Sequence, residues 1–204
     1  MTEEELRQSV VFAALFEYHA QKFLRIGDDG AGGKGPPLMY RMRPLRNDKA
    51  VAGYWRAVLG PKWKGPRPNA WCGAFALWCL QEAGLAPGVL WLVNHVNGTG
   101  IGFCEPQGLP HIPAAEVKPG DVAYFARWQH HAIVEKVVFA RLNHAANEGS
   151  ELWSIDGNQP AIDRHGPQGS LPARKLSDAA AFYSIAPFIT AALALPVQKE
   201  GNNT

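Results

Sequence analysis

The chain of 204 residues is long enough for one domain with a sizeable core and short for two. Its composition, 47% hydrophobic and 19% charged, is typical of a globular protein, and a net charge of +2 without a run of Lys or Arg gives no support for nucleic-acid binding. No apolar run approaches the roughly 20 residues of a bilayer span, so membrane insertion is not expected. The acidic start MTEEELRQSV lacks the features of a secretory signal, so we expect synthesis in the cytoplasm without a signal peptide.

Helices are expected in the first third of the chain. In LRQSVVFAALFEYHAQKFLRI, apolar side chains recur with a helical period, and we expect this stripe to face the core. The stripe consists of Phe12, Leu15, Phe16 and Phe23, with His19 packing at its edge. A second helix is predicted after Asn47 and Asp48, either of which could cap it. Residues 1–66 are therefore predicted to form a helical extension within the same globular unit as the rest of the chain.

The third predicted helix contains two of the three cysteines. It runs from about Ala70 to Ala83 in NAWCGAFALWCLQEAGL, and Gly84 is placed to stop it. Cys72 lies at the helix start, where unpaired N–H groups and the helix dipole stabilise a thiolate. Cys79 lies two turns further on the apolar face, so we predict a small core residue there. Cys104 falls in a predicted loop, and a disulfide between Cys79 and Cys104 stays open as an alternative.

The pattern changes after residue 120 to short runs rich in Val, Ile and aromatic residues. These runs, which are typical of strands, are DVAYFARW, HAIVEKVVFARL, ELWSIDGN and AAFYSIAPF. Helices first and strands last predict the α+β class, with N-terminal helices packed on a C-terminal antiparallel β-sheet. Residues 197–204 are expected to be a frayed tail.

Three later motifs supply partners for a nucleophile at Cys72. A Pro-Gly-Asp turn opens one strand, the pair His130 and His131 opens the next, and a third strand ends in Asp156-Gly157-Asn158. Taken in order, WCGAF, PGDVAYF, HHAIV and IDGN resemble the CHAP family of cysteine, histidine-dependent amidohydrolases and peptidases over roughly residues 68–165. The family's usual pattern is Trp-Cys-Ala-Ala-Phe, Pro-Gly-Asp, His-Val-Gly-Ile-Val and Ile-Glu-Gly-Asn. The resemblance implies a papain-like fold and a CHAP-like catalytic domain over residues 67–196.

The resemblance implies Cys72 as the nucleophile and His130 as its base, because Ala132-Ile133-Val134 matches the frame that follows the family's histidine. Neighbouring strand residues point to opposite faces, so only one of the two histidine rings is expected to reach Cys72. Asp156 stands where the family usually has Glu. Its side chain is one methylene shorter, so its backbone must lie closer to the imidazole by about that length. Asn158 matches the family's following Asn, so Asp156 and Asn158 are both candidates for the third catalytic member.

Tryptophans flank the motifs. Trp71 and Trp128 are candidate substrate-binding residues that line a cleft, and packing in the core is the alternative. For Trp153 the core is favoured. No cofactor is expected, and no metal, because adjacent histidines of one strand cannot converge on one ion.

The resemblance implies hydrolysis of an amide bond of bacterial peptidoglycan, either within the stem peptide or between muramic acid and L-Ala. Such enzymes are phage lysins or secreted antibacterial effectors, so action in the periplasm or cell wall would follow delivery by a holin or a type VI-like secretion system. An effector would imply a cognate immunity protein. The alternatives are a papain-like amidase that acts on a small peptide conjugate, and a non-catalytic binding module of the same fold.

Overall fold

A computed structural model of the chain describes residues 1–26, 53–54, 56, 71–85, 92–93, 102–103, 109–140, 149–158 and 161–195. The helices are α1 (Glu3–Ile26), α3 (Cys72–Glu82) and α4 (Ala186–Leu193). Short 3-10 helices are η2 (Ala114–Glu116), η3 (Ala126–Trp128) and η4 (Leu176–Asp178). Across these described ranges, no helix combines the length and apolar character that a bilayer span requires.

The strands form one small and one large antiparallel sheet. The small sheet pairs β1 (Leu92–Val93) with β2 (Gly102–Phe103). The large sheet has the order β3-β9-β4-β5-β6-β7, and β8 pairs with β6 beside β7. Its strands are β3 (His111–Ile112), β4 (Val122–Phe125), β5 (His130–Val138), β6 (Glu151–Asn158), β7 (Ala161–His165), β8 (Arg174–Lys175) and β9 (Ala181–Tyr183). N-terminal helices followed by an antiparallel sheet confirm the predicted α+β class.

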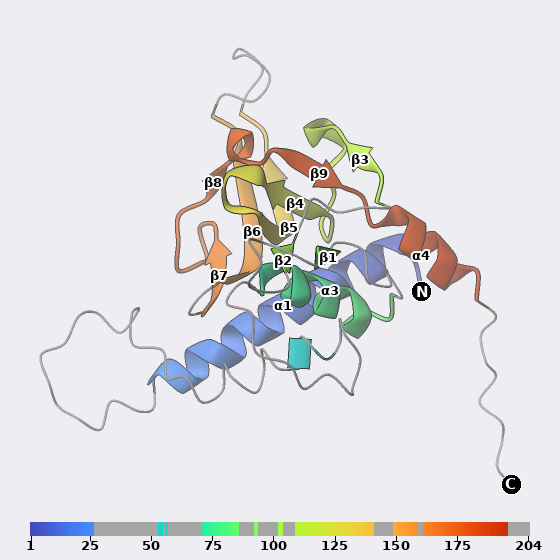
Figure 1. Ribbon diagram of the computed structural model, residues 1–204, viewed down its shortest axis with the longest axis horizontal. Helices are drawn as coiled ribbons and strands as arrows, with labels where there is room; N and C mark the ends of the chain where they lie inside the picture. The colour runs from blue at the N-terminus through green and yellow to red at the C-terminus, as the bar shows by residue number, and fades with distance from the viewer. Residues whose placement is uncertain are drawn as a thin grey trace, which may run out of the picture.

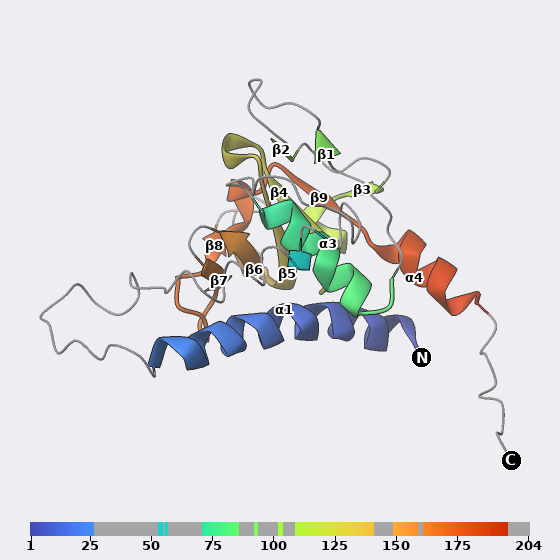
Figure 2. The same cartoon turned by 60° about the horizontal axis from the view of Figure 1, so that its bottom comes forward.

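The helices α1 and α3 cover one face of the large sheet. α3 packs on β5 and β6, and α1 packs on α3 and on β5, β6 and β7 (Figure 1). Seen from the turned view of Figure 2, α1 runs along the edge of the molecule with α3 directly against it. A hydrophobic cluster fills the space between these helices and the sheet, and a second cluster around Phe125 and Leu152 lies on the opposite face.

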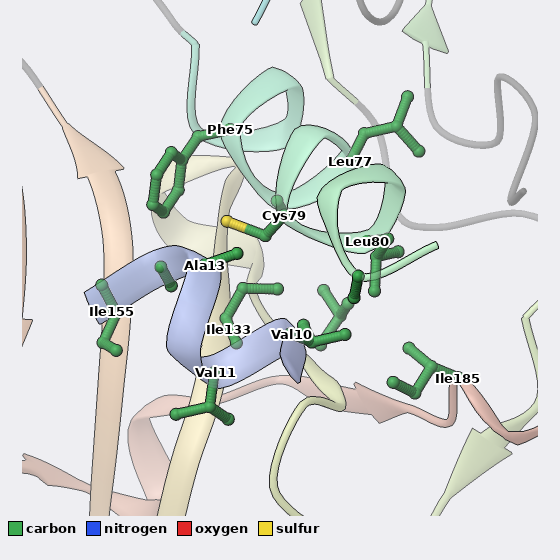
Figure 3. Packing of buried hydrophobic residues seen from close by; sticks show 14 of the residues in the cluster. Val10, Val11, Ala13, Phe75, Leu77, Cys79, Leu80, Ile133, Ile155 and Ile185 are labelled. Atoms are coloured by element: carbon green, nitrogen blue, oxygen red, sulfur yellow. The ribbon is translucent and has the colours of Figure 1, made fainter. Parts of the chain in front are cut away.

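The predicted third helix is confirmed, with Trp71 as its N-cap and Cys72 as its first residue. At its other end, Gly84 has φ +80° and donates its N–H to Gln81, while Leu85 donates to Leu80. This pattern of hydrogen bonds is the Schellman motif, for which a glycine is the preferred residue. Cys79 is buried among residues of α1 and the sheet, as predicted, and Figure 3 shows its sulfur between α3 and Ala13.

The predicted core face of α1 is wrong at three of its residues, whereas Leu15 is half-buried against the core. Phe12 is 67% and Phe16 58% exposed, and His19 is exposed as well. The buried face contains Arg7, Tyr18 and a set of smaller apolar residues. These smaller residues are Leu6, Val10, Val11, Ala13 and Ala14. Alanine and valine let α1 approach α3 closely, whereas phenylalanines at the contact would hold the two helices apart. Of the remaining predictions, the Phe23 side chain, Cys104 and residues 197–204 lie outside the described residues, and from the second helix Gly53, Tyr54 and Arg56 are described and helical.

Candidate active site

The nucleophile candidate Cys72 occupies the first helical position of α3. The Trp71 side chain makes no capping hydrogen bond, and no acidic residue lies in the first turn. The positive end of the helix dipole therefore acts on Cys72 without a competing carboxylate. The residue is only 3% exposed, and its sulfur lies 3.9 Å from the Gln129 carbonyl oxygen.

Strand pairing brings His130 and Asp156 together. His130 opens β5, Asp156 lies near the end of β6, and His130 Nε2 is 2.6 Å from Asp156 Oδ2. Burial lowers the pKa of His130, but its hydrogen bonds to Asp156 and Cys72 outweigh burial and raise the pKa to about 10. The aspartate is thus long enough to reach the imidazole, and His130 is held as an imidazolium beside the thiol.

The Cys72 thiol is poised for ionisation. Burial raises its pKa, yet hydrogen bonds with the His130 and His131 side chains oppose burial and lower the pKa to about 6. For comparison, Cys79 lies mid-helix without such partners, and burial raises its pKa well above the usual value. Both cysteines are free thiols. The two residues therefore differ in reactivity as their positions on the helix predict.

Sequence reasoning missed two further residues that contact Asp156. Arg174 Nη2 lies 3.1 Å from Asp156 Oδ1 and 3.0 Å from Oδ2, and its guanidinium packs over the Phe125 ring at 4.5 Å. The same Nη2 donates to His165 Nε2 at 2.9 Å, while His165 Nδ1 donates to the Pro172 carbonyl at 3.1 Å. His165 is therefore neutral, and burial lowers its pKa.

Arg174 compensates a carboxylate that is fully buried. Burial raises the pKa of Asp156, but the hydrogen bond and charge of His130 and the charge of Arg174 lower it below its usual value. No local signal in the sequence points to Arg174, because it reaches Asp156 through the pairing of β8 with β6, where Arg174 lies opposite Leu152.

The expectation that only one histidine ring reaches Cys72 is wrong. His131 Nδ1 lies 3.8 Å from Cys72 Sγ, and both imidazoles lower the pKa of this thiol. His131 faces α3 together with Ile133, whereas His130 packs on Phe125 on the other face. Both reach the sulfur because His130 is the first residue of β5 and follows Gln129, whose left-handed backbone (φ 49°) starts the strand beside the helix end.

The two tryptophan candidates lie in different surroundings. Trp71 is 4% exposed and stacks on Tyr54 with ring centroids 5.6 Å apart, so the structure favours the core alternative for its ring. Trp128 is 53% exposed in η3, two residues before His130, where it remains available to a substrate. Trp153 is half-buried, with the Lys136 ammonium 5.0 Å from its ring centroid.

The third predicted site element is described in part. Asp156 makes the contact with His130, and the side chain of Asn158 at the end of β6 lies outside the described residues. Within the described parts of the chain, no group of three or more His, Cys, Asp or Glu side chains is arranged to hold a metal ion.

The arrangement can generate a nucleophile and move a proton. It combines a thiol of lowered pKa, an imidazolium that can donate a proton, and a carboxylate that orients the imidazole. Comparisons with protein-family models, curated proteins and solved structures find no match to this chain.

Proposed function

We propose that the protein is a cysteine amidase or endopeptidase with a papain-like, CHAP-like catalytic unit, which hydrolyses an amide bond of bacterial peptidoglycan. The observation that carries the catalytic part is the line from Cys72 at a helix start through His130 to the buried Asp156. The substrate class rests on the resemblance of four ordered motifs to the CHAP family. In this proposal the enzyme acts in the periplasm or cell wall, as a phage lysin or as a secreted effector with a cognate immunity protein.

The proposed reaction is acyl transfer to sulfur followed by hydrolysis. The Cys72 thiolate attacks the amide carbonyl, and N–H groups at the start of α3 stabilise the oxyanion. The His130 imidazolium gives its proton to the leaving amine, which departs as the C–N bond breaks. Neutral His130 then takes a proton from water, whose oxygen attacks the thioester, and the C–S bond breaks to restore the Cys72 thiolate beside the His130 imidazolium. Asp156 holds the imidazole in one orientation throughout.

The products formed from muropeptides test the proposed substrate. Purified protein is incubated with muropeptides, and mass spectrometry identifies any amide to which one water has been added. We expect cleavage of the stem peptide or of the bond between muramic acid and L-Ala. Cys72→Ala and His130→Ala should abolish it to the same level, because members of one catalytic unit do not contribute additively. Intact muropeptides after prolonged incubation with folded protein would refute the substrate assignment.

A second candidate follows from the low exposure of the nucleophile. Only 3% of Cys72 is exposed, which favours a narrow approach and therefore a small peptide conjugate over a long glycan strand. A parallel incubation with glutathione conjugates tests this amidase activity. Hydrolysis of the conjugates alone would support the small-substrate amidase, and hydrolysis of neither substrate class would support the non-catalytic binding module.

A further inference from the structure

The imidazole of His131 lies close to the sulfur of the proposed nucleophile, Cys72. His131 is completely buried, and its Nδ1 is 3.8 Å from Cys72 Sγ. Its ring packs on Tyr124, its cross-strand neighbour on β4, with ring centroids 5.2 Å apart. Strand pairing and burial therefore hold the His131 ring next to the sulfur. The CHAP pattern that the sequence resembles has valine at this position, so the imidazole is a feature of this chain.

The sulfur is set in surroundings that oppose its ionisation. Cys72 is buried, and a buried thiolate needs hydrogen-bond donors to replace the water it has lost. The side chains that lower the thiol pKa are His130 and His131 of β5, and the first turn of α3 contributes no acidic residue. Asp156 of β6 is bonded to His130 Nε2, and Tyr124 of β4 packs on His131. Within the described parts of the chain, two imidazoles from one strand are thus the side chains that favour the thiolate.

We propose that His131 is a second catalytic histidine, which donates a hydrogen bond from Nδ1 to the Cys72 thiolate while His130 carries the proton transfers. This inference rests on the proposed function. The thiol proton moves to the His130 nitrogen that faces the sulfur, since Nε2 is engaged by Asp156. In this role His131 keeps its Nδ1 proton throughout, so it stabilises the anion without taking part in the proton transfers. Its task is to hold the sulfur ionised and aimed before substrate arrives.

The ionisation of Cys72 can be measured without a substrate. In protein labelled with 13C at cysteine Cβ, the Cys72 signal is assigned by Cys72→Ser and followed against pH. His131→Phe keeps a ring against Tyr124 but has no N–H to donate. His131→Val places there the residue of the resembling family, so one of the two variants should fold. The matched control is His111→Phe, because His111 also lies opposite a tyrosine, Tyr183, but at the exposed β3.

We expect the wild-type midpoint near pH 6 and an upward shift of about 1–2 units in either folded His131 variant, with no shift in His111→Phe. At a pH below the midpoint this shift lowers the thiolate fraction about 10–100-fold. An unchanged or lower midpoint in a folded His131 variant overturns the inference. A shifted midpoint in a protein that hydrolyses no amide would keep the role of His131 at the thiol and refute the proposed function. Amide hydrolysis with an unmoved midpoint would keep the proposed function and refute the role of His131.

Discussion

Four side chains of alternating charge meet at the candidate site: the Cys72 thiolate, the His130 imidazolium, the Asp156 carboxylate and the Arg174 guanidinium. The charges sum to zero, and each neighbour in the series favours the charged form of the next. This pairing matters because Asp156 is fully buried and Cys72 nearly so, where an isolated charge would be very costly. Removing one member therefore changes the protonation of the others, and the direction of each change can be predicted.

The first prediction concerns the pH dependence of hydrolysis. The reactive ion pair requires an ionised thiol and a protonated His130, so the rate should rise near pH 6 and fall near pH 10. In Asp156→Asn, loss of the carboxylate that raises the His130 pKa should move the falling limb to lower pH. The measurement is the pH profile of kcat/KM for both proteins. A falling limb at the same pH in Asp156→Asn would contradict the pairing of His130 with Asp156.

The second prediction assigns a positioning role to Arg174. Its positive charge lowers the pKa of Asp156, so Arg174→Gln should raise that pKa and, by the same Coulomb sign, the pKa values of His130 and Cys72. Both limbs of the pH profile should move upward by about one unit, opposite to the shift expected in Asp156→Asn. Arg174→Lys keeps the charge and should restore the limbs, although the maximal rate stays reduced because an ammonium lacks the planar geometry of the guanidinium. A lower rate with unmoved limbs in Arg174→Gln would indicate that the residue serves packing alone.

The site could be predicted only where its residues belong to local patterns. Cys72 opens a helix and His130 opens a strand, and both were chosen as site residues because the motifs around them resemble the CHAP pattern. Arg174 and His165 depend on which strands pair with β6, and the spacing of residues along the chain does not encode that pairing. The sequence predicted that the His131 ring points away from Cys72, because neighbouring residues of a strand face opposite sides. Alternation does not say how close the start of α3 lies to the start of β5, and there the His131 ring is 3.8 Å from the sulfur.

At the scale of elements, α3 packs so closely on β6 at Gly157 that no side chain would fit there. A Cβ atom at Gly157 would lie 2.5 Å from Cζ3 and 2.6 Å from Cε3 of Trp71, and 2.8 Å from Cβ of Phe75. Trp71 is itself held by Tyr54, so its ring cannot turn away freely. Gly157 follows Asp156 and Trp71 precedes Cys72, so this contact sets the distance between the nucleophile and the carboxylate strand.

The third prediction is that Gly157→Ala separates these two elements. We expect a loss of about 1–3 kcal/mol in the free energy of unfolding and a larger proportional loss of activity, because the helix start moves away from His130. Gly53→Ala is the matched control, since no atom of the described residues outside its own helix lies within 4 Å of a Cβ at that position. Adding Trp71→Phe should recover part of the stability of Gly157→Ala, because phenylalanine lacks the fused ring that makes the clash. Strictly additive effects in the double variant, measured by chemical denaturation, would contradict the contact.

The elements themselves were predictable where their period is clear. The helix that contains Cys72 follows from a helical period, and the strands β4, β5, β6 and β9 follow from short runs rich in Val, Ile and aromatic residues. The helix α4 was missed because its sequence APFITAAL is apolar nearly throughout, so no polar face marks a helical period. The face of α1 was misassigned because apolar residues occur around most of that helix, and packing against α3 selects the smaller ones.

At the scale of the whole molecule, one buried ion pair joins the N-terminal helix to the sheet. Arg7 of α1 donates from Nη1 to Asp121 Oδ1 at 2.8 Å and to the Pro119 carbonyl at 3.2 Å. Asp121 also accepts the backbone N–H of Ile185 at 3.0 Å, just before α4, and that of Lys118 at 2.8 Å. The aspartate of the Pro-Gly-Asp motif thus ties together α1, the turn before β4 and the segment that leads into α4.

The fourth prediction is that this ion pair makes α1 necessary for the catalytic unit. Arg7→Met leaves the buried Asp121 carboxylate without its counter-charge, so the free energy of unfolding should fall by about 3–5 kcal/mol. Gln8→Ala is the matched control, because Gln8 is exposed and contacts Glu4 of its own helix. Asp121→Ala should be more damaging than Arg7→Met, since it also leaves the N–H groups of Lys118 and Ile185 without their acceptor. Urea denaturation measures all three. If Arg7→Met were no less stable than Gln8→Ala, α1 would be a separable extension whose attachment does not depend on this pair, and the site built on α3, β5 and β6 should then survive its removal.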